Sequence, residues 1–531
     1  MRSSRDRRRL RTSTLSVRSA QDLGVGEPLV STAPIAPARA AATKKPRAPA
    51  STTPVRGPVP GADEIIFLPL GGCNRIGMNM TLYGHAGKWL IVDAGVAFGG
   101  DDMPEVQSFM VDPAFIEERM NDVVGLVVTH AHEDHIGAIH HLWPRLTCPI
   151  YATPFATHLI RERLKEAGAA RSVQVNTMPI GGRIKIGPFD IETIAVTHSI
   201  PEPVSLAIRT KAGNLLHTGD WKFDPEPLVG QATDFAALKR LGDEGVLAMV
   251  CDSTNAEVEG TTGSEGQARA GLIEAFRNRK GAIAVTCFAS NVARMKAVAM
   301  AAAANDRKVV LAGRSLLRME KAARACGYLD GLPPFLSLSE ASSVPRRNLV
   351  LICTGSQGEE RSALSKIARA EHRSLALQRG DTVIFSARTI PGNEPAIEAI
   401  YELLKTMGVT IVTPSDAPVH VSGHPARGDL TRMYELVRPR FAVPVHGEIH
   451  HLEAHARLAR GCGVERALVP EDGDIIRLAD TNTAVVGHIE PDRLVNDGQF
   501  LLPWAGSVEA TFGIRAEQRA ERRSTNSAFA A

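Results

Sequence analysis

The sequence predicts an α/β fold in which one domain is interrupted by a second, parallel α/β unit. Three observations support this prediction. Hydrophobic strand-like runs repeatedly end in His or Asp, which is how a sheet edge assembles one site from distant segments. Short β-rich runs alternate with helical stretches between about 235 and 395, as in a parallel sheet. Histidine is absent between His217 and His372, and His372 lies in the charged run 369–373, which is expected to be exposed, so a site that needs another imidazole must draw it from beyond that unit.

The first domain should begin with a strand that runs into the turn Gly71-Gly72. Its expected strands are 64–70, 80–83, 89–92, 191–196 and 215–216. In the parallel unit the expected strands are 246–250, 282–285, 308–311, 349–352 and 382–385, with helices at 266–277 and 292–304. The resulting segments are a tail at 1–60, the first domain at 61–234, the inserted unit at 235–395, the rest of the first domain at 396–490, and a short C-terminal tail at 491–531.

Composition restricts the class of protein. The chain has 531 residues, 44% of them hydrophobic and 22% charged, which is ordinary for a globular protein of more than one domain. No run approaches eighteen apolar residues, so no membrane span is predicted. Seven scattered cysteines without a Cys-x-x-Cys pair favour reduced thiols and a cytoplasmic location over a disulfide framework.

The basic charge is concentrated in the N-terminal segment. Residues 1–56 hold twelve Arg or Lys against three acidic residues, a net charge of +9, which leaves −6 for the rest of a chain of net charge +3. The segment lacks apolar periodicity and is predicted to be disordered. It could be a solvated extension, an RNA-binding arm or an organelle transit peptide, and the first two are favoured.

A cluster of potential metal ligands follows the apolar run 123–129. His130, His132, Asp134 and His135 lie within six residues, and imidazole with carboxylate suits Zn²⁺ or a similar divalent ion. A polar surface turn rich in histidine is the weaker reading, because four donors at this spacing rarely arise without a ligand. The cluster predicts a metal site at the end of a strand.

Two ions would need about seven donors, more than this cluster supplies. His198 and Asp220 each follow an expected strand, and a carboxylate such as Asp220 can bridge two ions. A further imidazole must come from beyond the inserted unit, where His420, His424 and His446 are the candidates.

These residues resemble the signature of the metallo-β-lactamase superfamily. Asp252, His424 and His446 around the insertion resemble its β-CASP branch, which processes nucleic acids. Within that branch the chain is similar to the bacterial ribonuclease J family over roughly 64–490. The matching motifs are Phe67-Leu68-Pro69-Leu70-Gly71-Gly72, His130-Ala131-His132-Glu133-Asp134-His135-Ile136-Gly137, Thr197-His198-Ser199-Ile200-Pro201-Glu202, His217-Thr218-Gly219-Asp220-Trp221-Lys222, Thr354-Gly355-Ser356-Gln357-Gly358-Glu359 and Pro391-Gly392-Asn393-Glu394.

The resemblance implies a metallo-β-lactamase αββα sandwich that carries an inserted β-CASP domain and two Zn²⁺ ions, with Mn²⁺ as a substitute. One ion would be held by His130, His132 and His198, the other by Asp134, His135 and His446, with Asp220 as the bridge. Hydroxide activated by the two ions would attack the phosphodiester. Asp93 would orient a ligand imidazole, His424 would stabilise the oxyanion or protonate the leaving group, and Asp252 would orient His424. Asp134 and Asp93 are therefore counted with the catalytic group.

The same resemblance implies a single-stranded RNA substrate. Gly355, Ser356, His420 and Ser422 would form a pocket for a 5′-monophosphate, beside His424 at the scissile phosphate. Such a pocket implies 5′→3′ exonuclease action together with endonuclease cuts, in maturation of ribosomal RNA and decay of messenger RNA, with 5′-phosphate and 3′-hydroxyl products. Ser290, Asn291 and Arg294 are expected to touch the RNA backbone.

Two departures from the family stand out. The family usually has an acidic residue where this chain has Arg75, and the C-terminal domain that supports oligomerisation has no counterpart in the roughly forty residues after Leu494. A homo-oligomer is therefore an open expectation. Two other functions remain as alternatives: a hydrolase of DNA or of a small ester or lactone with the same metal chemistry, and a catalytically silent RNA-binding scaffold.

Overall fold

The computed structural model describes residues 57–99, 103, 105–506, 508 and 510–513. The predicted N-terminal tail, apart from residues 57–60, lies outside these ranges, as do residues 514–531. The described residues form two large mixed sheets, one parallel sheet and one small antiparallel sheet.

The two large sheets form the centre of the metallo-β-lactamase domain. The eight-stranded sheet has the order β22-β21-β1-β2-β3-β6-β7-β8, and the seven-stranded sheet β20-β19-β13-β12-β11-β10-β9. The strands of the first are β1 (Ile65–Gly71), β2 (Met80–His85), β3 (Lys88–Val92), β6 (Val123–Val127), β7 (Ile150–Ala152), β8 (Val175–Thr177), β21 (Asp474–Leu478) and β22 (Ala484–His488). Those of the second are β9 (Arg183–Ile186), β10 (Phe189–Ala195), β11 (Val204–Thr210), β12 (Gly213–His217), β13 (Ala248–Asp252), β19 (Phe441–Val445) and β20 (Arg466–Ala467).

One hydrophobic core joins the facing sides of these sheets. Phe67 and Val92 from the first sheet share a buried cluster with Leu206, Val250 and Val443 from the second. Because helices cover the outer faces, the central strands are buried on both sides and are continuously apolar instead of alternating. The helices are α5 (Phe235–Glu244), α12 (Arg427–Val437) and α13 (Ile449–Gly461) on the second sheet, and α1 (Ala114–Glu117), α2 (Glu133–Ile136), α3 (Ile139–Leu142) and α4 (Pro154–Glu166) with the first. The predicted αββα sandwich is confirmed.

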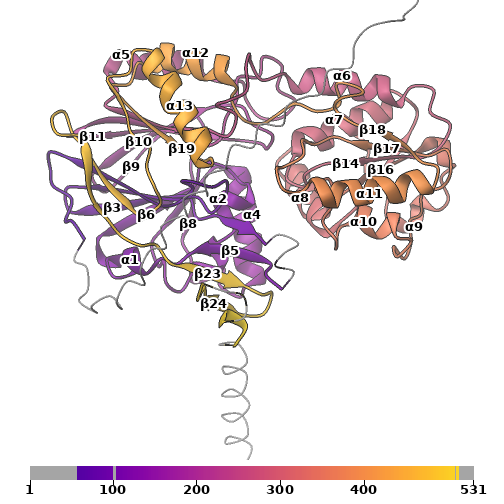
Figure 1. Cartoon of the computed structure of the whole chain (residues 1–531), viewed down its shortest axis with the longest axis horizontal. Coiled ribbons are helices and arrows are strands. Elements are labelled where there is room, and N and C mark those ends of the chain that lie inside the picture. The colour runs from indigo at the N-terminus through magenta and orange to yellow at the C-terminus, as the bar shows by residue number, and fades with distance from the viewer. Residues whose placement is uncertain (1–56, 100–102, 104, 507, 509, 514–531) are drawn as a thin grey trace, which may run out of the picture. The chain divides into compact units, whose positions relative to one another are not determined.

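The insertion is a five-stranded parallel sheet with the order β15-β16-β14-β17-β18. Its strands are β14 (Ile283–Thr286), β15 (Lys308–Ala312), β16 (Leu349–Cys353), β17 (Thr382–Phe385) and β18 (Thr410–Val412). Its helices are α6 (Glu265–Phe276), α7 (Val292–Ala303), α8 (Arg314–Ala325), α9 (Leu338–Ala341), α10 (Ala363–Ala368) and α11 (Glu394–Thr406), visible around the sheet in Figure 1. Ser264 closes a capping box on α6, and the Asn291 side chain caps α7, so both helices begin where polar side chains accept backbone N–H groups.

Strand membership places the insertion later than the expected range 235–395. Strand β13 belongs to the seven-stranded sheet, where it lies parallel to β12 and β19, and β18 extends the inserted sheet to Val412. A buried parallel strand has the same apolar sequence pattern in either sheet, so the pattern alone did not separate them.

The segment after 490 forms structure where the sequence suggested a short tail. β23 (Arg493–Asn496) and β24 (Leu501–Pro503) extend a small antiparallel sheet with β4 (Val96–Phe98) and β5 (Ser108–Val111). Trp504 packs edge-to-face on Phe109 at 5.5 Å between ring centroids. Strands this short give a weak sequence signal, because their stability depends on the strands they pair with; here β23 pairs with β5. Within the described ranges, no helix is long and apolar enough to span a membrane.

Candidate metal centre

Strand ends bring the predicted ligands together. His130 follows β6, His198 follows β10, Asp220 follows β12 and His446 follows β19. Among the expected site residues other than glycine, two have a left-handed backbone, with φ of 62° at Asp93 and 56° at His446. Such conformations are strained for residues other than glycine and are found where surrounding contacts fix a functional side chain.

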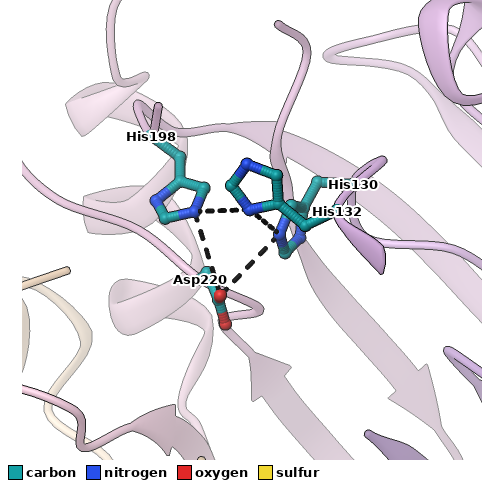
Figure 2. A group of neighbouring side chains, drawn as sticks. All are labelled: His130, His132, His198 and Asp220. Carbon is teal, nitrogen blue, oxygen red and sulfur yellow. Dashed lines mark hydrogen bonds and ion pairs between the residues drawn. The ribbon is translucent and has the colours of Figure 1, made fainter. Parts of the chain in front are cut away.

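The first group of donors consists of His130, His132, His198 and Asp220. In Figure 2 the three imidazoles point toward one another and toward the carboxylate. The His132 Nδ1 atom lies 3.2 Å from His130 Nε2 and 3.0 Å from His198 Nε2. Nitrogens bound to one tetrahedral zinc at ~2.0–2.1 Å would lie about 3.3 Å apart, so this spacing fits a single ion.

The second group consists of Asp134, His135, His446 and the same Asp220. The Asp220 Oδ2 atom lies 3.3 Å from His135 Nε2 and 3.4 Å from His446 Nε2. It also lies 3.7 Å from His130 Nε2, in the first group. Asp220 is thus the one residue common to both groups, which is the place that a bridging carboxylate must occupy.

The hydrogen bonds of the imidazoles decide which nitrogen faces the site. His135 Nδ1 donates to Asp93 Oδ2 at 2.7 Å, and His198 Nδ1 donates to the Gly423 carbonyl at 2.6 Å. Since these oxygens can only accept, each Nδ1 carries a hydrogen, so in the neutral ring the lone pair is on Nε2, which faces the site. Gly423 has no side chain to block the approach: a Cβ there would lie 2.7 Å from His198 Cε1.

Thr129 and Ser199 fix two further rings. The Thr129 hydroxyl donates to Asp93 Oδ2 at 2.8 Å, so it accepts from His130 Nδ1 at 3.1 Å. His132 is turned the other way, with Nε2 at 3.3 Å from the Ser199 hydroxyl and Nδ1 toward the site. The inward nitrogens of these four rings therefore converge, and the outer nitrogen of each ring contacts an oxygen.

The site fits divalent cations by a test that is independent of the sequence motif. His446 Nε2 is buried and has no hydrogen-bond partner among the described residues, although His446 Nδ1 is bonded to Asn79 Oδ1 at 3.0 Å. A buried polar atom without a partner is costly, and an inward lone pair beside two carboxylates is what a metal ion satisfies.

Burial and charge tune the centre in two ways. Burial and neighbouring histidines lower the pKa of His132 to about 4, and they lower the pKa values of His130 and His198, so these rings are neutral. Burial opposes charge on His135 as well, but Asp220 and Asp134 outweigh it and raise the pKa of that ring. The three imidazoles of the first group are thus uncharged, and the negative charge of the centre comes from Asp134 and the shared Asp220.

His424 and Asp252 form a separate pair beside the ligands. His424 Nδ1 donates to Asp252 Oδ2 at 2.8 Å, and Asp252 Oδ1 accepts from the Thr254 amide and hydroxyl. Burial disfavours the imidazolium, but Asp252 and Asp220 overcome it and raise the pKa of His424 to about 9. The ring is stacked on His446 with centroids 5.6 Å apart. The His424 ring is thereby held against the second group.

A hydrogen-bonded chain connects the Thr354–Glu359 loop with the segment that contains His424. Gln357 Nε2 donates to the Arg388 carbonyl, Arg388 Nη1 donates to Asn255 Oδ1, and Asn255 Nδ2 donates to Ser422 Oγ at 2.8 Å. In the same loop Ser356 Oγ is buried without a partner in the described part of the chain. Gly355, with φ of 119°, would bring a Cβ within 2.5 Å of Ser362 Oγ.

The expected RNA contacts of the β-CASP domain divide into two kinds. His420 is half-buried, and burial and the nearby Arg294 lower its pKa to about 3, so it is neutral. Arg294 is fully buried and donates to Glu265, the Ser386 carbonyl and the Val419 carbonyl. It therefore cannot contact RNA, and that expectation is wrong. Arg294 instead anchors its own domain.

The neighbouring expected contacts show the same mixture. Ser290 is half-buried, but the Asn291 side chain is buried and engaged in capping α7.

Arg75, the departure from the family pattern, has its Nε atom 3.6 Å from the Asp472 carboxylate. The other oxygen of that carboxylate, Oδ1, accepts from the backbone N–H of Cys73. The reversed charge therefore has an acidic partner within the protein.

Comparison with known proteins agrees with this geometry. Residues 75–245 match the metallo-beta-lactamase superfamily, 280–404 the beta-CASP domain of ribonuclease J, and 417–470 the Zn-dependent metallo-hydrolase RNA specificity domain. Ribonuclease J of Sinorhizobium meliloti is 44% identical over 443 residues, which are 83% of this chain and 78% of that protein. The chain belongs to the ribonuclease J family.

Further relatives give the same result. Ribonuclease J of Mycolicibacterium smegmatis is 42% identical and that of Mycobacterium tuberculosis 41%, each over 84% of this chain and 80% of the relative. A solved structure of a protein of unknown function from Enterococcus faecalis is similar in fold alone, with a TM-score of 0.56 and 17% identity over 78% of this chain and all of that one. As a family member the chain is a metal-dependent ribonuclease.

Several residues of the centre were not identified from the sequence. Asn79, Thr129 and Ser199 hold imidazoles of predicted ligands, and Arg388 and Asn255 connect the Thr354–Glu359 loop to Ser422. Thr129 and Ser199 directly neighbour ligands, so adjacency was an available signal. No such signal pointed to Asn79, because its hydrogen-bond partner His446 lies 367 positions away in the sequence.

Proposed function

We propose that this member of the ribonuclease J family cleaves RNA at a centre of two divalent ions. The observation that supports this proposal best is the convergence of inward imidazole nitrogens on Asp220, with His446 Nε2 left without a hydrogen-bond partner among the described residues. His130, His132 and His198 would hold one ion, and Asp134, His135 and His446 the other, with Asp220 between them. Zn²⁺ suits this imidazole-rich set, and Mn²⁺ is the expected substitute.

When bound, such ions generate a nucleophile from water near neutral pH and stabilise charge on phosphoryl oxygens. The protein supplies orientation. Asp93 fixes the tautomer of His135 and, through Thr129, that of His130. Asp134 and Asp220 keep negative charge at the centre, because nearby histidines lower the pKa of both carboxyls against the effect of burial.

His424 is the proposed acid. Its imidazolium is held by Asp252 and carries the proton that the departing 3′ oxygen requires, or stabilises charge on the phosphoryl oxygens. Asp252 acts through His424 as a positioning residue, because both of its oxygens accept hydrogen bonds from the protein. The products would carry 5′-phosphate and 3′-hydroxyl ends.

The second part of the proposal concerns the 5′ end of the substrate. The phosphate would bind the Gly355-Ser356 loop, where Ser356 Oγ has no protein partner among the described residues, together with His420 and Ser422. Arg294 Nη1 donates to His420 Nδ1, so the proton of the neutral ring is on Nε2, the atom proposed to face a phosphate oxygen. Recognition of a 5′-monophosphate at this pocket supports 5′→3′ exonuclease action, with endonuclease cuts when the pocket is not used. Ser290 is an additional backbone contact.

A gel assay with added Zn²⁺ or Mn²⁺ tests these proposals. Labelled single-stranded RNA with a 5′-monophosphate should be shortened to mononucleotides, and the same RNA with a 5′-triphosphate should be degraded more slowly. Circular RNA reports endonuclease action alone. His132→Ala should abolish all cleavage, and retention of cleavage would refute the two-ion centre. Preference for DNA or for a small ester would refute the substrate, and binding of RNA without cleavage would favour the scaffold alternative. Oligomeric state and a cytoplasmic location stay predictions; each of the seven cysteines, all within the described ranges, is a free thiol.

A further inference from the structure

The side chain of Asn79 lies between ligands of the second group that are far apart in sequence. Its Nδ2 atom is 3.0 Å from the Asp134 carbonyl oxygen, and its Oδ1 atom is 3.0 Å from His446 Nδ1. The carbonyl can only accept, so the amide nitrogen must face Asp134 and the amide oxygen must face His446. The orientation of the amide is therefore fixed by its partners.

This orientation determines the tautomer of His446. Because Asn79 Oδ1 accepts, the proton of the neutral ring is on Nδ1, and the lone pair is on Nε2. That Nε2 atom is buried and faces Asp220 and Asp134 at 3.4 and 3.7 Å. With the proton on Nε2 instead, the ring would present N–H to this group and could not bind an ion. His135 and His198 obtain the same selection from Asp93 and from the Gly423 carbonyl, and for His446 the selecting oxygen is that of Asn79.

The backbone around Asn79 is built to hold it there. The backbone N–H of Asn79 donates to the backbone carbonyl of Asp134 at 3.1 Å. The backbone carbonyl of Asn79 accepts from the backbone N–H of Gly95 at 3.0 Å. Gly72, with φ of 96°, leaves the space that the Asn79 side chain fills, since a Cβ there would lie 2.4 Å from Asn79 Oδ1. The Gly72 carbonyl also accepts from the His446 amide at 2.7 Å. One loop thus fixes the backbone and the ring of His446.

We propose that Asn79 is a positioning residue that makes the second metal site, and only the second, competent to bind its ion. It does so by holding His446 with Nε2 unprotonated while it anchors the Asp134 carbonyl. The proposal rests on the two-ion centre proposed above. The first site does not depend on Asn79, because its rings are held by Thr129, Ser199 and Gly423. Loss of an outer hydrogen bond to a ligand typically weakens metal binding 10- to 100-fold.

The test replaces Asn79 by leucine, which has a similar volume and no hydrogen-bonding group. Mn²⁺ binding is measured by titration calorimetry and by metal content after dialysis, and electron paramagnetic resonance separates a spin-coupled ion pair from a single ion. Wild type should bind two ions with a coupled signal. Asn79→Leu should bind the first with unchanged affinity and the second about 10- to 100-fold more weakly, with the signal of an isolated ion. His446→Ala is the reference for a lost ligand.

Asn74→Gly is the matched control. Asn74 is an exposed residue of the same loop with φ of 58°, which glycine adopts without strain, so this variant should bind two ions like wild type. Two tightly bound, coupled ions in Asn79→Leu would overturn the proposal, as would loss of the second ion in Asn74→Gly. If Asn79→Leu does not fold, Asn79→Ser is measured instead, with the same expected and opposing outcomes. A single ion in wild type would refute the two-ion centre itself, and this result is distinguishable from failure of the Asn79 role.

Discussion

Replacing Arg294 by methionine should lower the free energy of unfolding by about 3–5 kcal/mol, the cost of breaking a buried ion pair by removing one partner. The Arg294 side chain is fully buried, and its Nη2 atom lies 3.1 Å from both carboxylate oxygens of Glu265. Its Nη1 atom donates to the Ser386 and Val419 carbonyls. Methionine fills similar space but leaves the Glu265 carboxylate with Lys222 at 3.9 Å as its remaining cation. Adding Glu265→Gln should therefore recover part of the loss.

Urea unfolding followed by circular dichroism measures this loss. Arg277→Met is the matched control, because Arg277 forms an exposed pair with Glu274 and its replacement should stay within about 0.5 kcal/mol of wild type. RNA affinity is measured in parallel against salt concentration. A stability change below 1 kcal/mol for Arg294→Met would refute the anchoring role. The anchoring role would also be refuted if stability were unchanged and the slope of log RNA affinity against log salt concentration fell in magnitude by about 0.7. A change of that size indicates the loss of one phosphate contact on a single strand.

Three further outcomes are expected. His424→Ala should lower kcat by about 10²- to 10⁴-fold, and Asp252→Asn by less, with metal content unchanged; loss of bound metal in either variant would show that the pair belongs to the metal ligands instead. Dialysis against EDTA should abolish cleavage and lower Tm. Adding back Mn²⁺ or Zn²⁺ at 100 times its Kd should raise the free energy of unfolding by about 2.7 kcal/mol. An unchanged Tm would argue against ions bound by the folded centre. Burial lowers the pKa of His455 from 6.5 to about 4, so the folded state binds fewer protons than the unfolded chain, and stability present above pH 6.5 is lost as the pH falls toward 4. His455 is bonded to Ser253 and Tyr434, and His455→Gln should reduce this acid-induced loss by up to about 3 kcal/mol; identical pH profiles of the two proteins would contradict the assignment.

The sequence was informative where chemistry and local pattern coincide. The cluster His130–His135 and the strand-end residue Asp220 could be predicted as ligands from the sequence, because rare donor types follow apolar runs. His446 was one of three candidate histidines, and only the family resemblance distinguished it. The gap in histidine between His217 and His372 predicted, from the sequence alone, that a unit is inserted into the first domain. Its edges were less visible, since β13 and the strands of the inserted sheet are equally apolar.

Burial and tertiary partners were what the sequence could not supply. From the sequence, Arg294 is predicted to be a basic RNA contact next to Ser290 and Asn291. Whether its guanidinium faces solvent or a buried carboxylate depends on Glu265, which lies 29 positions away. Asn79 reads as an ordinary loop residue until the chain returns at His446. Roles that depend on distant contacts, such as tautomer selection, need coordinates.

The place of β19 in the seven-stranded sheet has a consequence for synthesis of the protein. This strand lies between β13 and β20, and it carries His446 at its end. A nascent chain that has not yet reached residue 446 has five of the six proposed ligands other than the bridging Asp220, and lacks the last. The order of the chain therefore makes the proposed second ion site one of the last parts of the protein to be completed during synthesis.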